Sequence, residues 1–329
     1  MGLAAVLPKI PHLKRRIQET AAHILDVKPD ILVTIDSPDF VFRVAWEVRA
    51  RAEKPPLMIH YAAPSVWAWR PGRAKKLSAL YDGILCLLPF EPPYFEAEGM
   101  RACFTGHPML ETGILNADGH AFRRKKGIAD DAQVIGLLPG SRRSELRKTG
   151  NILFEAAQKL AEDNPALHII LPTMPHLAEE IKTLYPGSRG RLHIVTDGIP
   201  EKWNAFKACN AAMATSGTVG LELAVCGVPH LIAYKMNPAT WHILRRLVRV
   251  KYAHLANIIL DSGAVPEFIQ DQCDADRIAA RVNEIMSGKA AAQQLKDFNT
   301  IRDSIEPDGG VSPSRRAADF ILRLHGELS

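Results

Sequence analysis

The feature that most constrains the fold is a series of short apolar runs that alternate with helical patterns along most of the chain. The runs are continuous rather than alternating, which is typical of strands buried on both faces of a parallel sheet. Helical patterns lie between them, for example Ser144–Asp163 and Gly217–Cys226. The sequence therefore predicts an α/β fold built from βαβ units. The expected strands are Ile31–Ile35, Leu57–Tyr61, Ile84–Leu88, Val134–Leu138, His168–Leu171, Leu192–Val195, Ala211–Ala214 and His230–Ala233.

The length of the chain and a polar interruption in its strand–helix alternation predict two domains. The chain has 329 residues, more than one ordinary hydrophobic core holds. A polar stretch from His107 to Gln133 interrupts the alternation, and a fresh strand follows it. We therefore expect a first domain over residues 1–115 and a second over 130–305. The C-terminal helix, within 311–329, is expected to complete the first domain.

The composition limits the classes of ligand and surface that the protein is expected to bind. The formal charge of +5 suits anionic small molecules or an anionic membrane surface, and no nucleic-acid-binding motif appears. The five cysteines are scattered without a C-x-x-C pair, so we expect reduced thiols and a cytoplasmic protein. No apolar stretch is long enough to span a bilayer, so any membrane contact is expected to be peripheral.

The stretch "LLPGSRRSEL" (Leu137–Leu146) predicts a strand, a tight turn and a helix. Amides of Gly140 and Ser141 near a helix N-terminus can bind an anion, and Arg142 adds a guanidinium fork for phosphate oxygens. The structural alternative is a capped turn with a surface arginine.

The stretch "TSGTVGLEL" (Thr215–Leu223) is a second turn of this kind in the same expected domain. Its amides can bind an anion together with the hydroxyls of Ser216 and Thr218, and Gly217 lets a ligand approach the backbone closely. The carboxylate of Glu222 can accept hydrogen bonds from two sugar hydroxyls. A tight turn with a good N-cap is the structural alternative. Ligands of open α/β sheets bind at the carboxyl ends of strands, so the two turns support one another. Neither is a Walker A or G-x-G-x-x-G motif, which disfavours ATP and NAD.

Two further stretches carry candidate chemistry. In "VTIDSPDFVFR", Asp36 follows a buried strand and is well placed as a general base, although Asp36 or Asp39 could instead cap the next helix. In "YAAPSVWAWRPGRAKKL", tryptophans beside cations suit a sugar face, an anionic lipid or a membrane edge. A packed loop with solvated lysines is the alternative there.

The stretch from Pro238 to Leu255 predicts one amphipathic helix with Trp241 and several leucines on one side and arginines elsewhere. Such a helix packs against a domain or a partner subunit, or it lies on anionic lipid.

The strings "IDSPDF", "PSVWAWR", "LPFE", "TGHPM", "LPGSR", "SGTVGLE" and "LANIILDSGAVPEFIQ" occur in this order. On these motifs the chain resembles the lipid-A-disaccharide synthases, glycosyltransferase family 19, from about residue 1 to residue 325. The resemblance implies two Rossmann-like domains facing a cleft, the GT-B fold. It also implies an inverting transfer from UDP-2,3-diacylglucosamine to 2,3-diacylglucosamine 1-phosphate, giving the β-1,6 disaccharide 1-phosphate and UDP, without metal or cofactor.

The resemblance further implies roles, a location and a partner. The expected location is the cytoplasmic surface of the inner membrane of a Gram-negative bacterium, and the expected assembly is a homodimer. Asp36 matches the catalytic aspartate, and Arg142 and Asn257 match donor-binding residues. The expected donor site adds Gly140, Ser141, Ser216, Gly217, Thr218 and Glu222. The expected acceptor or lipid-facing residues are Ser65, Trp67, Trp69, Arg70 and His107.

One departure concerns the front of the chain. The family begins with a strand and a Gly-Glu-x-Ser-Gly-Asp loop that nothing here matches, and the opening residues resemble an interior stretch. We therefore expect an incomplete N-terminal domain. The alternatives are a truncated protein that binds UDP-sugar without turnover, or another enzyme of this fold, such as a UDP-N-acetylglucosamine 2-epimerase or a cell-wall N-acetylglucosaminyl transferase.

Overall fold

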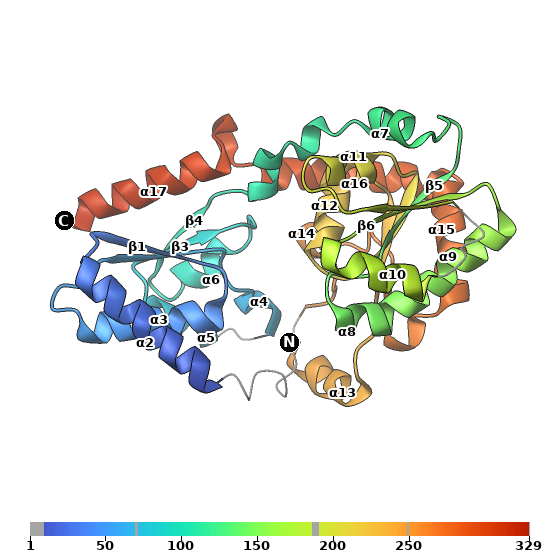
Figure 1. Cartoon of the computed structure of the whole chain (residues 1–329). Coiled ribbons are helices and arrows are strands. Elements are labelled where there is room, and N and C mark those ends of the chain that lie inside the picture. The colour runs from blue at the N-terminus through green and yellow to red at the C-terminus, as the bar shows by residue number, and fades with distance from the viewer. Residues whose placement is uncertain (1–9, 70–71, 186–190, 249, 329) are drawn as a thin grey trace. The chain divides into compact units, whose positions relative to one another are not determined.

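The computed structural model describes residues 10–69, 72–185, 191–248 and 250–328. The chain divides into two compact units, each with its own parallel sheet (Figure 1). Unit 1 comprises Met1–Pro108 and Ile305–Ser329, and unit 2 comprises Met109–Ser304. In the described ranges, no helix has the length and apolar character needed to cross a bilayer.

Unit 1 contains, within its described residues, a four-stranded parallel sheet in the order β1-β2-β3-β4. Because each strand is added on the same side, right-handed crossovers bring the connecting helices to one face. That face packs on α2, α3 and α5, and α17 covers the other face through Ala317, Phe320 and Leu324 (Figure 1). The elements are α2 (Ile10–Val27), β1 (Ile31–Ile35), α3 (Pro38–Arg51), β2 (Leu57–Tyr61), α4 (Val66–Trp69), α5 (Gly72–Ser78), β3 (Gly83–Cys86), α6 (Pro92–Glu96), β4 (Arg101–Phe104) and α17 (Pro313–Leu328).

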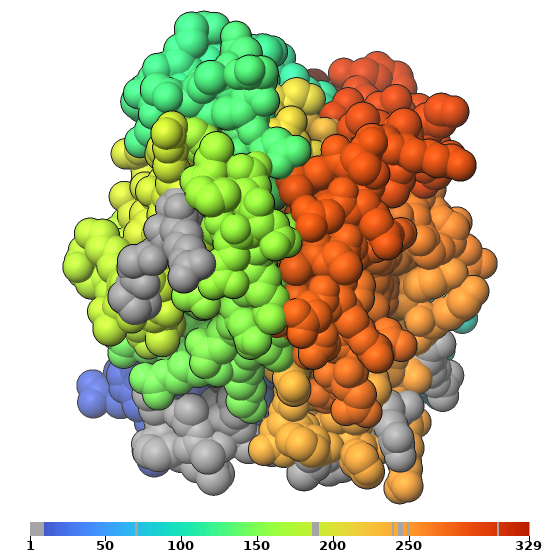
Figure 2. Space-filling model, turned by 90° about the vertical axis from the view of Figure 1, so that its right-hand side faces the viewer, coloured from blue at the N-terminus to red at the C-terminus, as the bar shows by residue number. Residues whose placement is uncertain are grey.

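Unit 2 contains, in the part that the structure describes, a six-stranded parallel sheet in the order β10-β9-β8-β5-β6-β7. One face packs on α9 and α15, which lie side by side as the green and orange-red surfaces of Figure 2. The strands are β5 (Val134–Leu138), β6 (His168–Pro172), β7 (Arg191–Val195), β8 (Ala211–Thr215), β9 (His230–Tyr234) and β10 (Glu267–Ile269). The helices are α7 (Gly119–Lys126), α8 (Arg143–Glu145), α9 (Asn151–Asp163), α10 (Ala178–Leu184), α11 (Glu201–Lys207), α12 (Thr218–Cys226), α13 (Pro238–Leu247), α14 (Leu255–Leu260), α15 (Ala275–Met286) and α16 (Lys289–Ile305).

The polar segment around α7 packs into unit 2. Arg123, on α7, is only 6% exposed, and its guanidinium donates to the carbonyl of Ala208 and to the side chain of Asn210. The break between the units accordingly falls at Pro108, ahead of the polar stretch's main part.

One helix expectation is wrong. The stretch from Pro238 to Leu255 forms α13 only as far as Leu247, because the amides of Ala253 and His254 donate to the Glu267 carboxylate instead of continuing a helix. The expected helix Ser144–Asp163 is confirmed, since α8, η4 (Leu146–Gly150) and α9 follow one another directly, with a π-helical turn at η4. Such turns are frequent at functional sites.

Candidate active site

The strand order of unit 2 reverses between β5 and β8. From central β5 the chain runs outward through β6 and β7 and then returns to β8 on the other side of β5. Ligands of open parallel sheets bind in the crevice outside the carboxyl ends of the strands at such a reversal. Since β5 and β8 are paired in parallel, the structure brings both expected phosphate turns to the same edge of the sheet, at this reversal. They carry Gly140, Ser141 and Arg142 after β5, and Ser216, Gly217 and Thr218 after β8.

In the turn after β5, the chain's own Glu145 is bound as an anion. Ser141 N donates to Glu145 Oε2 at 3.0 Å, and Arg142 Nη1 donates to Glu145 Oε1 at 2.9 Å. Gly140 has a φ of 113°, and a Cβ at this position would lie 2.6 Å from the Glu145 Cβ, so only glycine permits the fold-back. An amide and a guanidinium that bind this carboxylate can also bind a phosphate.

The turn after β8 is open. Gly217 and Thr218 are exposed, and a Cβ on Gly217 would meet no atom within 4 Å, which leaves room for a ligand against the first turn of α12. The Ser216 hydroxyl donates to the Ala253 carbonyl at 3.4 Å. The Thr215 hydroxyl is buried and has no hydrogen-bond partner among the described residues. Buried polar groups are normally paired, so this hydroxyl is consistent with a site for a polar ligand.

Asn257 is buried and hydrogen-bonded within unit 2. Its amide nitrogen donates to Val265 O and to Glu267 Oε1, both at 2.8 Å, and its oxygen accepts from Val265 N at 2.8 Å. Glu267 also accepts from the amides of Ala253 and His254. Asn257, which is expected in the donor site, therefore stabilises the loop around Ala253, which the Ser216 hydroxyl contacts.

Two buried histidines lock the same loop against α12. His230 Nδ1 lies 2.8 Å from the Val228 carbonyl and donates to it, and His254 Nδ1 accepts from Ala256 N at 2.9 Å. His254 Nε2 must then carry the proton that it donates to His230 Nε2 at 2.9 Å. Burial lowers the pKa of His230 to about 4 and that of His254 well below its usual value, so both rings are neutral. A Cβ on Gly220 would collide with the His254 ring, so α12 approaches it closely.

Glu222 lies half-buried on α12. Its Oε2 accepts from Lys202 Nζ at 2.6 Å, and that ammonium group lies 4.5 Å from the centroid of the Trp203 ring. The other carboxylate oxygen of Glu222 has no partner among the described residues and is available to a sugar hydroxyl.

In unit 1, the backbone bends sharply at Asp36, directly after β1. Asp36 and Ser37 have φ values of 50° and 43°, and Ala62, which follows the neighbouring β2, has a φ of 71°. Each non-glycine residue in this left-handed region costs on the order of 1–3 kcal/mol, and such residues cluster at functional sites. Asp36 N donates to Tyr61 O at 3.2 Å, which holds the bend at the edge of the sheet.

Asp36 does not cap the next helix. The N-cap of α3 is Ser37, and Asp39 in the first turn accepts from Arg73 Nη2 at 2.9 Å. The Asp36 side chain is exposed and forms no hydrogen bond or ion pair with any residue that the structure describes. A free carboxylate in this position can accept a proton from a ligand hydroxyl.

A buried polar cluster lies close to this bend. The Thr34 hydroxyl is 2.9 Å from His60 Nδ1 and 2.9 Å from the Tyr81 hydroxyl. Burial lowers the pKa of His60 to about 4, so the ring is neutral. Sequence reasoning did not single out these residues, and the only available signal was a histidine inside the apolar run of β2.

Trp67, which was expected to line the acceptor site or to face lipid, is buried and does not face lipid in this structure. Its side chain packs edge-on against Phe90, with 5.2 Å between ring centroids, and its indole N–H donates to Glu91 Oε1 at 3.1 Å. The ring is 9% exposed because it fills the space between the segments that follow β2 and β3. Sequence reasoning missed Glu91 as a functional candidate, as it missed Glu145.

The other expected residues of unit 1 follow the carboxyl ends of the same parallel strands. Ser65 is exposed, Trp69 is half-buried, and Arg70 lies outside the described residues. His107 follows β4, is half-buried, and has its pKa lowered to about 4 by burial. Because parallel strands end at one edge, Ser65, Trp69 and His107 follow the same edge of the sheet as Asp36.

Comparisons with known proteins show which family and which fold the chain resembles. A family model described as lipid-A-disaccharide synthetase matches residues 1–311. A lipid-A-disaccharide synthase from Rhodospirillum centenum is 45% identical over 323 residues, which cover 98% of this chain and 80% of that protein.

Two solved structures share the fold. An S. aureus MnaA–UDP co-structure has a TM-score of 0.67 at 14% identity, covering 95% of this chain and 82% of that chain. An E. coli trehalose-6-phosphate structure bound with UDP-2-fluoro glucose has a TM-score of 0.57 at 15% identity, covering 97% and 78%. At such identities the likeness shows the two Rossmann-like domains alone.

Proposed function

The chain belongs to the lipid-A-disaccharide synthase family, and on this premise we propose that it transfers 2,3-diacylglucosamine from UDP-2,3-diacylglucosamine to 2,3-diacylglucosamine 1-phosphate. It is a glycosyltransferase of lipid A synthesis, and its relatives do not favour the binding-only or epimerase alternatives. The observation that carries the proposal is 45% identity to such a synthase over 98% of the chain.

The donor's diphosphate binds at the β5–β8 crevice of unit 2. Support comes from the Ser141 amide and the Arg142 guanidinium, which already hold an anion, and from the open turn at Gly217. As the bond from the donor sugar to UDP breaks, negative charge develops on the leaving phosphate. Fixed donors aimed at that charge stabilise the transition state.

The acceptor binds in unit 1, where Asp36 is the general base. Its carboxylate accepts the proton of the acceptor 6-hydroxyl while the oxygen forms a bond to C1 of the donor sugar. The strained bend at Asp36 supports this role, as does its carboxylate, which has no competing partner among the described residues. General base catalysis typically contributes about 10²–10⁴ in rate.

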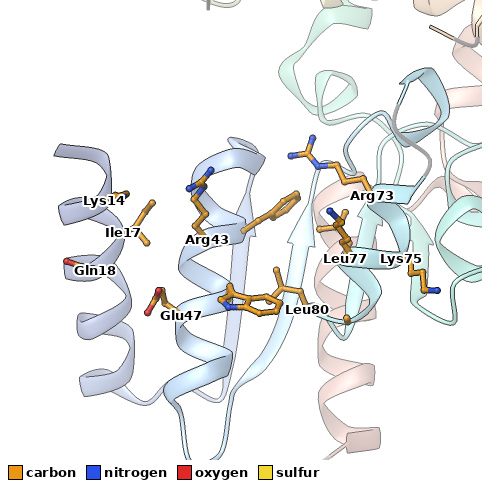
Figure 3. Close-up of a pocket in the computed structure, with 13 residues that line it drawn as sticks. Lys14, Ile17, Gln18, Arg43, Glu47, Arg73, Lys75, Leu77 and Leu80 are labelled. Atoms are coloured by element: carbon orange, nitrogen blue, oxygen red, sulfur yellow. The ribbon is translucent and has the colours of Figure 1, made fainter. Parts of the chain in front are cut away.

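Both substrates carry acyl chains, so we also propose a peripheral contact with the inner membrane surface. Its support is a groove of about 990 Å³ in unit 1, lined by α2, α3 and α5 (Figure 3). Trp46 is 63% exposed in this groove, over an apolar floor that includes Ile17 and Leu80. The cations on its rim have no ion pair with a described residue, and they are Lys14, Arg43, Lys75 and Lys76. Exposed aromatics with basic residues suit an anionic interface.

The test is a turnover assay with both acylated substrates. We expect UDP and the disaccharide 1-phosphate, detected by mass spectrometry. UDP binding without any product would support a binding-only protein. Conversion of UDP-N-acetylglucosamine to its 2-epimer would support an epimerase. We also propose a homodimer, from the resemblance alone, and sedimentation equilibrium tests it.

A further inference from the structure

We propose that Glu145 is a resident anion of the donor site, which the diphosphate of the donor must displace in order to bind. The proposal rests on the proposed function, because it assumes that the diphosphate binds at the turn after β5. It assigns Glu145 a part in setting the affinity and selectivity of that site.

The geometry of the turn carries the proposal. The two oxygens of the Glu145 carboxylate engage two different anion-binding groups, the Ser141 amide and the Arg142 guanidinium. The Glu145 side chain is only 20% exposed, so it lies packed on the turn rather than extended into solvent. Gly140 lacks the Cβ that would prevent this approach.

Glu145 pairs with Arg142 and with neither of the other nearby arginines. The next two arginines, Arg143 and Arg147, reach a different carboxylate, Glu180, at 3.0 and 3.8 Å. Among the described residues, Arg142 is the only ionic partner of Glu145. A phosphate that takes the same two donors must therefore break this contact, since a second anion beside an ionised carboxylate is repelled.

A purely structural role makes the opposite prediction. Glu145 is the third residue after the N-cap Arg142, a position from which a glutamate can stabilise the start of a helix. If that were its whole role, removing the carboxylate would loosen the turn and weaken the binding of UDP. If Glu145 competes with the ligand, removing it strengthens the binding of UDP while the unliganded protein becomes no more stable.

Displacement also predicts which ligands respond. When only a fraction of the protein has its site free to bind, the apparent affinity for a ligand is the intrinsic affinity multiplied by that fraction. UDP brings a charge that competes for Arg142 and the Ser141 amide, whereas uridine brings none. The effect of Glu145 is therefore expected on UDP and not on uridine.

The experiment compares the full chain with Glu145→Gln by calorimetric titration with UDP and with uridine. A partly exposed ion pair changes the equilibrium between its formed and broken states by a few-fold. We therefore expect Glu145→Gln to bind UDP at least about three-fold more tightly than the wild type. Uridine affinity should stay unchanged, and the melting temperature without ligand should stay equal or fall. In an Arg142→Ala background, Glu145→Gln should increase UDP affinity less, because only the contact of Glu145 with the Ser141 amide remains to be displaced.

The control variant is Glu284→Gln. Glu284 also pairs with an arginine three residues earlier, Arg281, but on α15 and not at the turn, so UDP affinity should be unchanged. Equal or weaker UDP binding by Glu145→Gln would overturn the inference while leaving the proposed donor site intact. If neither the wild type nor Glu145→Gln binds UDP, the proposed function fails and the inference fails with it.

Discussion

The indole N–H of Trp67 donates to the Glu91 carboxylate at 3.1 Å, which joins the segment after β2 to the turn after β3. The amides of Leu87 and Leu88 donate to the other oxygen of Glu91 at 3.1 and 3.0 Å. Burial nevertheless raises the pKa of Glu91 to about 7, against 4.5 for a free glutamate. The contact that holds Trp67 therefore changes its charge close to neutral pH.

The first prediction concerns this pH dependence. The folded state binds the Glu91 proton more tightly than the unfolded state, so its stabilising contribution is complete below pH 4.5 and is lost as the pH rises through about 7. Relative to Glu91→Gln, the free energy of unfolding of the wild type should fall by up to about 3 kcal/mol across this window. Urea titrations followed by tryptophan fluorescence at several pH values measure the difference. A difference that is constant with pH would show that Glu91 does not titrate there.

The second prediction concerns Asp36→Asn. The amide keeps the shape of the carboxylate but cannot accept the proton, so kcat should fall by about 10²–10⁴. UDP affinity should stay near wild type, because the proposed UDP site lies in unit 2. Turnover and calorimetric titration are measured on the same preparation. A variant that keeps more than about a tenth of wild-type turnover would remove Asp36 from the role of base.

The third prediction concerns Arg142→Ala. A charge-assisted hydrogen bond to phosphate contributes about 1.5–3 kcal/mol, so UDP should bind roughly ten-fold more weakly or worse. Arg281→Ala is the matched control, because that arginine also pairs with a glutamate three residues later, on α15. Equal UDP affinity in the two variants would exclude a direct contact between Arg142 and the diphosphate.

The fourth prediction locates the membrane contact. Replacing Arg43, Lys75 and Lys76 with glutamine should release the protein from vesicles that contain anionic phospholipid, because each basic residue near such a surface contributes about 1 kcal/mol. Co-sedimentation at moderate salt measures binding, and thermal melting checks folding.

The comparison variant for this experiment carries glutamine at Arg245, Arg246 and Arg249, on and beyond α13. Leu247, the last residue of α13, and Val248, which follows it, are 48% and 41% exposed, so this segment is the competing surface. The side chain of Arg245 and the whole of Arg249 lie outside the described residues. Release by this variant, with the groove variant still bound, would move the contact from the groove to α13.

Local patterns predicted most strands within a residue or two, because continuous apolar runs are the direct signature of buried parallel strands. The two strands that were missed are β4 and β10, which lie at the ends of their strand orders and are only half-buried. With one side left to solvent, their sequences, Arg101–Phe104 and Glu267–Ile269, lack a long apolar run. The broken helix after Pro238 failed for a different reason, since Glu267, far along the chain, binds the amides that the helix would have used.

The sequence by itself determined the parallel α/β units, the two turns that follow β5 and β8, and the place of Asp36 after β1. These features depend on local periodicity and turn chemistry, which neighbouring residues encode. Only the tertiary structure decided that Glu145 folds back onto Arg142 and that Glu91 accepts a hydrogen bond from Trp67. It also decided that the amide of Asn257 is hydrogen-bonded to Val265 and Glu267. Such contacts depend on which side chains burial brings together from separate segments, and on the space that a residue such as Gly140 leaves between them.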